Sequence, residues 1–225
     1  GGVAVVTLHR PAVRNAFNLA MRDALCETFD AVADDPEVRI VVLRGAGSDF
    51  CAGGDLREFG TAPSLTVARM TRWRRDFWGK LRTLPKITIA AIRGAAVGSG
   101  FEIALACDLR VAAADARFAF PETGRGLIPG ATGTQTAARV IGRGRALELV
   151  LTGRTVAAAE ARQLGLVSLV TDGVDSFPVA LALARRLEAV SLVSLAALKR
   201  AAREGLDLPL AAGLALERRC AATSA

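Results

Sequence analysis

Histidine is almost absent from this chain of 225 residues, in which His9 is the only one. It stands beside a proline at the end of an expected strand, so we expect a structural or exposed position for it. Hydrolases that use histidine as a base, and metal sites built from several imidazoles, are therefore poor interpretations. The lysine-containing phosphate-loop pattern is also missing, which argues against a nucleoside triphosphatase of that type.

Cysteine is scarce too, and the four cysteines are widely separated with no C-x-x-C pair: Cys26, Cys51, Cys107 and Cys220. This spacing argues against a disulfide framework and against a zinc site, and it predicts a reducing, cytoplasmic location. No apolar run reaches the 18 residues that a membrane helix needs. The first residues lack the basic-then-apolar pattern of a signal peptide, so we expect neither a membrane span nor secretion.

Low-complexity segments and proline-rich linkers are absent, while 52% of the residues are hydrophobic and 23% are charged. These values and the chain length predict a globular protein, with either one large domain or a domain with a helical appendage, and one domain is the better interpretation. The net charge of +7 favours an anionic partner. The densest basic patch, Arg69 to Arg82, has helical spacing and is expected to be a solvated face. A phosphorylated small molecule explains the charge at least as well as nucleic acid, since zinc ligands and interleaved aromatic residues are missing.

The apolar pattern alternates between short extended runs and helical stretches, which predicts an α/β fold built from β–α–β units. Expected strands are residues 3–8, 40–43, 87–92, 108–111, 117–120 and 166–170. Expected helices are residues 19–33, 64–84, 134–141, 144–151 and 157–164, followed by a helical part at 177–220 that is broken near 191 and 207–209.

Two glycine loops each follow an expected strand, Gly53-Gly54 and Gly98-Ser99-Gly100. A dinucleotide fingerprint fails at the second loop because its third glycine position holds Ile103. A nucleophile elbow fails as well, because Ser99 lacks glycines two residues before and after it. Instead, the two loops can direct two backbone N–H groups at one oxygen, which is the arrangement of an oxyanion hole.

Two glutamates with apolar neighbours follow the second loop, Glu102 and Glu122. Apolar surroundings raise the pKa of a carboxyl group and suit it to proton transfer near neutral pH. The pair is therefore a candidate acid–base pair, and two surface charges are the alternative that spacing alone leaves open.

The motifs occur in an order that resembles the crotonase (enoyl-CoA hydratase/isomerase) family, and the resemblance covers nearly the whole chain. The segments that carry it are residues 9–11, 15–17, 50–56, 94–108, 121–122, 126–130, 133–135 and 151–154. It implies a spiral of repeated β–β–α units over residues 1–175 and a helical part over residues 176–225. It also implies trimers or dimers of trimers that act on acyl-coenzyme A thioesters.

By the same resemblance, the backbone N–H groups of Gly54 and Ser99 form the oxyanion hole. Most members have glycine at the second position, and serine can serve there provided that its backbone does not need a positive φ. The two glutamates fall on the family's hydratase pair. Glu102 would activate a water for attack on C3 of a trans-2-enoyl thioester, and Glu122 would supply the proton to C2.

Further residues fall on the family's substrate path: Ala52, Asp55 and Leu56 along the adenine and pantetheine, Gly130 at the water site, and Arg14 and Arg57 near the phosphates, although exposed surface arginine explains the last two equally well. Coenzyme A would enter as part of the substrate, so no separate cofactor or metal is expected. Family members usually continue for some tens of residues beyond the position of Ala225, with helices that roof the acyl pocket.

Three functions remain open at this point. The first is a 2-enoyl-CoA hydratase of fatty-acid or related acyl degradation, which both glutamates favour. The second is a Δ3-Δ2-enoyl-CoA isomerase, or another crotonase-type reaction, in which Glu122 alone moves a proton. The third is a non-catalytic coenzyme A- or RNA-binding protein that uses its positive charge.

Overall fold

The computed structural model describes residues 1–223, apart from the side chains of Arg69, Arg72 and Trp73. Two arginines of the predicted basic patch thus fall outside the described residues. Of the others, Arg75 has 44% and Lys80 39% of its side chain exposed, and both pair with carboxylates of the first helix. This part of the patch is a solvated, salt-bridged face, as its spacing predicts.

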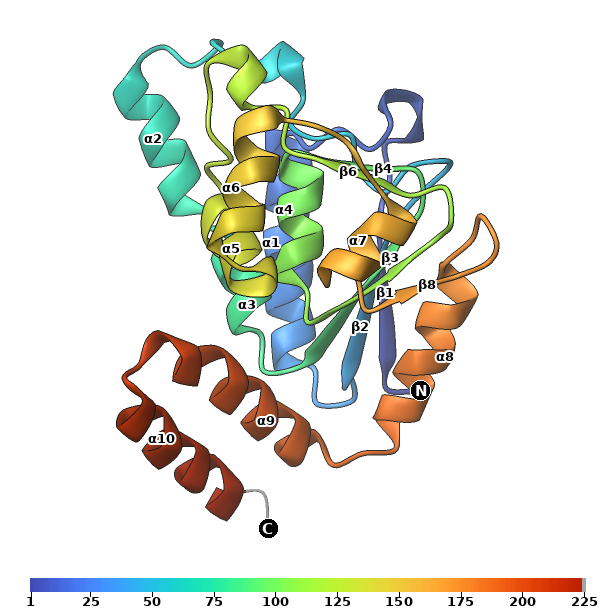
Figure 1. Ribbon diagram of the computed structural model, residues 1–225, viewed down its shortest axis with the longest axis vertical. Coiled ribbons are helices and arrows are strands. Elements are labelled where there is room, and N and C mark those ends of the chain that lie inside the picture. The colour runs from blue at the N-terminus through green and yellow to red at the C-terminus, as the bar shows by residue number, and fades with distance from the viewer. Residues whose placement is uncertain (224–225) are drawn as a thin grey trace.

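A parallel sheet of five strands forms the centre of the molecule (Figure 1). Its order is β1 (Val3–Leu8), β2 (Ile40–Gly45), β3 (Ile87–Ile92), β5 (Leu109–Ala112) and β8 (Leu169–Val170). The helix α1 (Leu19–Asp34) connects the first two strands, and Asn18 caps it by accepting a hydrogen bond from the Met21 N–H at 2.9 Å. The predicted β–α–β unit is confirmed.

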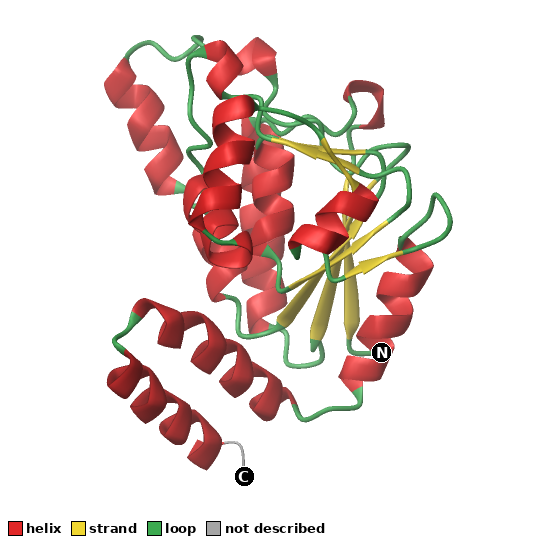
Figure 2. Ribbon diagram, viewed as in Figure 1, coloured by secondary structure: helices red, strands yellow, loops and turns green. Residues whose placement is uncertain are grey.

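Alternate residues of β2 face two different cores, because side chains alternate across a strand. Val41 and Leu43 pack into a large core that includes residues of α1 and of α4 (Ser99–Ala106). Ile40 and Val42 pack on the other face against α8 (Phe177–Glu188). Figure 2 shows the sheet between these two helical layers. Burial on both faces explains why this strand reads as one continuous apolar run.

A second, smaller sheet contains β4 (Ala95–Val97), β6 (Arg117–Ala119) and β7 (Val156–Ala157). The sequence analysis missed β4 and β7, which have three and two residues. With β4 in place, β3–β4–α4 is one β–β–α unit, and β5–β6 leads in the same way to α5. Three further helices follow β6: α5 (Gly133–Ile141), α6 (Arg143–Thr152) and α7 (Ala158–Leu164). The expected spiral of β–β–α units is confirmed.

The single helix predicted over residues 64–84 is wrong, because the segment forms α2 (Leu65–Arg74) and α3 (Phe77–Thr83). The first helix ends at Arg74, and Asp76 caps the second by accepting a hydrogen bond from the Gly79 N–H at 2.9 Å. The two helices also differ in burial: Phe77 is buried in the core, whereas Leu65 is 78% exposed. A strand predicted over residues 166–170 is shorter than expected, because only Leu169–Val170 pairs with β5.

Beyond α8, the helices α9 (Leu192–Glu204) and α10 (Leu210–Thr223) form a hairpin below the sheet (Figure 1). The breaks at Ser191 and at residues 207–209 are where the sequence predicts them. Four 3-10 turns complete the elements: Pro11–Val13, Leu56–Glu58, Thr123–Arg125 and Gly205–Asp207.

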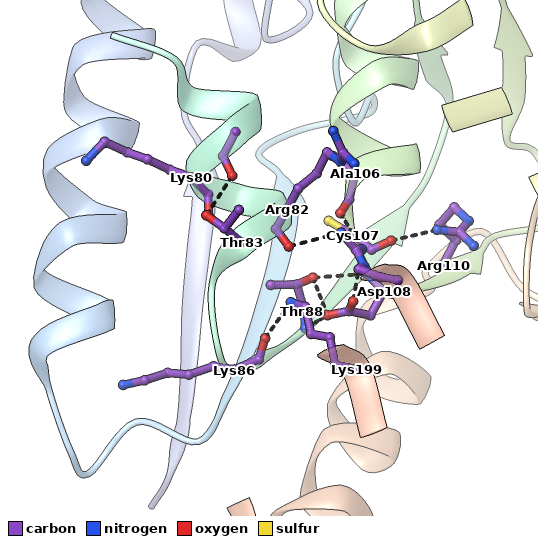
Figure 3. Close-up of polar contacts among 12 residues, drawn as sticks. Lys80, Arg82, Thr83, Lys86, Thr88, Ala106, Cys107, Asp108, Arg110 and Lys199 are labelled. Carbon is purple, nitrogen blue, oxygen red and sulfur yellow. Dashed lines mark hydrogen bonds and ion pairs between the residues drawn. The ribbon is translucent and has the colours of Figure 1, made fainter. Parts of the chain in front are cut away.

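A carboxylate with 13% of its side chain exposed connects α9 to the sheet (Figure 3). Asp108 lies just before β5 and accepts hydrogen bonds from the Thr88 N–H and hydroxyl at 2.8 and 2.9 Å. The same carboxylate pairs with Lys199 and Arg203 of α9, each at 2.9 Å. Burial lowers the pKa of Lys199, and the neighbouring Asp108 opposes that shift.

All four cysteines are free, as their spacing predicts, and all four are buried. Within residues 1–223, no helix combines the length and the hydrophobicity that crossing a bilayer requires. The cytoplasmic location and the division of the chain at residues 175–176 stay predictions.

Candidate active site

The two glycine loops lie side by side at one end of the sheet. Cys51, in the loop after β2, donates its N–H to the Ala95 carbonyl at 2.9 Å and accepts from the Val97 N–H at 3.0 Å. The approach is so close that a Cβ on Gly100 would stand 2.3 Å from the Cys51 carbonyl oxygen. Glycine at this position therefore lets the start of α4 rest on the first loop.

The N–H of Gly54 points to the side opposite Phe17, whose backbone is bonded to the residues before and after Gly54. Phe17 donates its N–H to the Gly53 carbonyl, and its own carbonyl accepts from the Asp55 N–H, both at 2.8 Å. In such a parallel bridge the middle residue, Gly54, has its N–H on the opposite side. Its N–H has no acceptor among the described residues.

Ser99 supplies a second free N–H beside the first. It is the first residue of α4, and the first N–H groups of a helix have no partner within it. A Cβ on Gly54 would lie 3.8 Å from the Ser99 hydroxyl oxygen, so the two residues are neighbours. The positive φ of this turn, 51°, falls on Gly98, and Ser99 has ordinary helical geometry. The backbone at Ser99 therefore does not need a positive φ, which is the condition under which serine can replace glycine at this position.

Glu102 is buried, with 2% of its surface exposed, and it caps a helix to which it does not belong. One carboxylate oxygen, Oε1, accepts hydrogen bonds from the N–H groups of Ala131, Thr132 and Gly133 at 2.8, 2.9 and 2.8 Å. These N–H groups lie at the N-terminus of α5, where a negative charge is favoured. The other oxygen, Oε2, has no hydrogen bond within the described residues and is free for other chemistry.

Glu122 follows β6 and lies against Gly98, where a Cβ would stand 2.6 Å from its Oε1. Its Oε2 is buried and has no hydrogen-bond partner among the described residues. Burial raises the pKa of Glu122 above its ordinary value, its own backbone N–H lowers it, and the nearby charge of Glu102 raises it further. The two glutamates therefore share one site, and Glu122 is the member suited to carry a proton.

The residues predicted along the substrate path, Ala52, Asp55 and Leu56, lie directly before and after Gly53-Gly54. Asp55 is 7% exposed and ion-pairs with Arg57 at 2.8 Å and with Arg10 at 3.0 Å. These guanidinium groups, that of Arg57 foremost, hold the pKa of Asp55 well below its usual range. Leu56 is 55% exposed. Ala52 is partly buried within the loop.

Three other predicted residues lie at the rim. The side chains of Arg14 and Arg57 are 62% and 67% exposed, although each is paired with an aspartate. Arg14 and its hydrogen bond lower the pKa of Asp49 to about 2. Gly130 is exposed, directly before the three residues that donate to Glu102.

Several residues at the site were missed by the sequence analysis. Arg10 connects the segment before α1 to Asp55, and Asn15 donates to the carbonyls of Ala46 and Asp49 at 2.8 and 2.7 Å. The ring of Phe59 lies 3.0 Å from where a Cβ of Gly54 would be. These contacts join residues far apart in the sequence. The signals that point to them are the segments 9–11 and 15–17, which carry the family resemblance, and the positive φ that asparagine tolerates at position 15.

Comparison with known proteins decides the family. The sequence pattern described as Enoyl-CoA hydratase/isomerase matches residues 1–224. The chain belongs to the enoyl-CoA hydratase/isomerase family. The 2,3-dehydroadipyl-CoA hydratase of Escherichia coli is 40% identical over 216 residues, which cover 96% of this chain and 84% of that protein.

Solved structures of the same family superimpose closely on the whole chain. An enoyl-CoA hydratase from Bacillus anthracis matches with a TM-score of 0.93 and 34% identity, covering 99% of this chain and 86% of that one. A relative from Thermobifida fusca, solved in complex with CoA, matches with a TM-score of 0.90 and 35% identity over 98% of this chain and 88% of its own. The architecture is thus the crotonase fold, as the resemblance implied.

Proposed function

We propose that this family member hydrates trans-2-enoyl-CoA thioesters to 3-hydroxyacyl-CoA. The observation that carries the proposal is the pairing of two glutamates in different environments beside two free backbone N–H groups. The matching relatives include a protein named as a CoA-thioester hydratase and one solved with CoA, which supports an acyl-CoA substrate. A homotrimer or dimer of trimers remains a prediction from the family resemblance.

In the proposed mechanism, the thioester oxygen accepts hydrogen bonds from the N–H groups of Gly54 and Ser99. Negative charge develops on that oxygen as water adds to the double bond, and each donor contributes about 3 to 4 kcal/mol of transition-state stabilisation. Neither N–H has to break a hydrogen bond first, because neither has an acceptor within the described residues.

The two glutamates divide the proton transfers. Glu102 holds the water through Oε2 and takes one of its protons as the oxygen bonds to C3 of the substrate. Glu122, whose pKa is raised by burial, gives a proton to C2. One water is added in each turnover: its hydroxyl goes to C3, its other proton goes to Glu102, and C2 receives the proton of Glu122. The enzyme returns to its starting state when Glu102 releases its proton to solvent and Glu122 takes one from solvent.

The test is hydration of crotonyl-CoA by Glu102→Gln and Glu122→Gln. We expect each change to lower kcat by about a hundredfold or more, because each removes one proton transfer. Glutamine at position 102 keeps an oxygen that can accept the three N–H bonds, so the fold should persist and can be checked by circular dichroism. Glu217→Gln, at an exposed position of α10, is the matched control.

An isomerase is the second candidate, since the family's description includes that activity and Glu122 alone can move a proton between two carbons. Turnover of a 3-enoyl-CoA with little hydration, and tolerance of Glu102→Gln, would select it. Near-normal hydration by either glutamine variant would rule out the two-glutamate mechanism. A non-catalytic role in binding coenzyme A or RNA is the outcome if neither thioester is turned over and RNA binding falls steeply with salt.

A further inference from the structure

The direction of the Gly54 N–H is set by the backbone bridge between the first loop and Phe17. Phe17 packs against the large core, where its ring centroid lies 4.8 Å from that of Trp78. The two hydrogen bonds of the bridge come from Gly53 and Asp55, one on each side of Gly54. The Gly54 N–H therefore keeps its direction only as far as this loop is held against the segment that contains Phe17.

Arg10 is bonded to both sides of that bridge through one guanidinium group. Its Nη1 donates to the carbonyl of Ala16, the residue before Phe17, and its Nη2 donates to Oδ2 of Asp55 at 3.0 Å. Asp55 is the residue after Gly54. A guanidinium group is planar and holds its two terminal nitrogens at a fixed separation. The group therefore sets the spacing of the two segments that the backbone bridge joins.

Arg57 pairs with the same carboxylate but stays within the loop. It lies two residues after Asp55, in the turn Leu56–Glu58, so its bonds do not reach the segment of Phe17. Arg10 comes from 45 residues earlier in the chain. Arg10 is itself held in place, because its backbone N–H donates to Oδ1 of the buried Asn15 at 2.9 Å. Of the two arginines, Arg10 is thus the one that attaches the loop to its neighbour.

We propose that Arg10 is a positioning residue of the oxyanion hole, which keeps the Gly54 N–H directed at the thioester oxygen; this rests on the acyl-CoA chemistry of the proposed function. A donor stabilises developing charge fully only when its direction is set before the reaction, and a displacement on the order of 1 Å can cost about a hundredfold in rate. Without the guanidinium group, the loop keeps its backbone bonds and loses the side-chain bonds to the Ala16 segment. The N–H of Ser99, which belongs to α4, is not part of this connection.

Arg10→Lys tests this role, because lysine keeps the positive charge and lacks the planar group with two fixed donors. Asp55 retains Arg57 as its counter-charge, so we expect the variant to fold, which circular dichroism can check. We expect kcat for crotonyl-CoA hydration to fall roughly tenfold while KM changes by less than about threefold, since one donor of the oxyanion hole is misdirected and the charge near the substrate is kept.

Arg139→Lys is the matched control. Arg139 also pairs with an aspartate, Asp207, at 2.8 Å, but both side chains are about half exposed and neither is bonded to a residue of the site. Its variant should keep kcat within about twofold, because exposed ion pairs contribute little. A normal kcat in Arg10→Lys would overturn the proposal, and so would a raised KM with unchanged kcat, which would assign Arg10 to substrate binding instead.

The infrared spectrum of bound butyryl-CoA, isotopically labelled at its thioester carbonyl, separates this proposal from the proposed function. This saturated thioester has no double bond to hydrate, so the measurement needs no turnover. A weaker hydrogen bond from Gly54 leaves the carbonyl bond stronger, and we expect its stretching band at a higher frequency in Arg10→Lys than in wild type or Arg139→Lys. An unchanged band would overturn the role of Arg10. The shifted band together with no hydration of any enoyl-CoA by the wild type would instead contradict the proposed function.

Discussion

Glu102 and Glu122 have the same carboxyl group, but its surroundings differ between the two residues. The first gives one oxygen to three backbone N–H groups, while the side chain of the second has no hydrogen bond to any other described residue. Burial is the largest influence on Glu122 and raises its pKa, although its own backbone N–H and Arg125 act against the rise. The difference suits one group to hold water and the other to deliver a proton.

The raised pKa of Glu122 predicts how stability depends on pH. Because the folded protein favours the neutral carboxyl, the stability it contributes is complete below the ordinary pKa of 4.5 and is lost as pH rises through the folded-state value. Glu122→Gln stays neutral and avoids this loss. We expect the melting temperature of the variant, relative to wild type, to be higher at about pH 8 than at about pH 4.

Thermal unfolding monitored by circular dichroism at the two pH values measures this difference. The exposed Glu217→Gln variant controls for the removal of one negative charge from the molecule. A relative melting temperature of Glu122→Gln that is constant, or that falls between pH 4 and pH 8, would contradict burial as the cause of the shift.

At the scale of elements, one carboxylate neutralises both cations through which α9 is bonded to the sheet region. Asp108 neutralises Lys199, whose side chain is 6% exposed, and also Arg203. Asp108→Asn leaves two cations without their counter-charge, so we expect the free energy of unfolding to fall by about 3 kcal/mol. Urea denaturation measures the loss, and amide hydrogen exchange should show faster exchange in α9.

The exposed pair Arg200–Glu204 on the same helix provides the comparison. Its side chains are 61% and 57% exposed, so Glu204→Gln should cost less than about 0.5 kcal/mol. Equal losses in the two variants would mean that the burial of the Asp108 group adds nothing to the attachment of α9.

Elements with long, strongly patterned sequences were predictable, and so were the breaks at Ser191 and residues 207–209, but the break at Asp76 was not. The continuous apolar run at residues 40–43 predicts a strand buried on both faces, and Asn18 predicts the start of α1. Residues 64–84 looked like one helix because the signal that divides them is a single cap at Asp76. The glutamates and glycine loops of the site were identified from the sequence, but the contact between Glu102 and residues 131–133 spans about thirty residues and depends on the tertiary fold.

For the whole molecule, the net charge of +7 is expected to influence how quickly a CoA thioester is captured. Exposed charges act over a distance that salt shortens. We predict that kcat/KM for crotonyl-CoA falls several-fold between about 0.05 and 0.5 M salt. Crotonyl-pantetheine, which has no nucleotide phosphates, should be much less affected. Equal salt dependence for the two substrates would show that the charge does not act through the phosphates.

The cap that Glu102 places on α5 has a consequence for interpreting related sequences. A protein that lost the chemistry but kept the fold would still need an acceptor for the N–H groups at positions 131–133, so selection for folding alone could preserve a side-chain oxygen at position 102, from glutamate or glutamine. The side chain of Glu122 meets no such structural demand. Among relatives, retention of Glu122 is therefore the better marker of an active enzyme, and retention of Glu102 by itself marks little more than an intact helix.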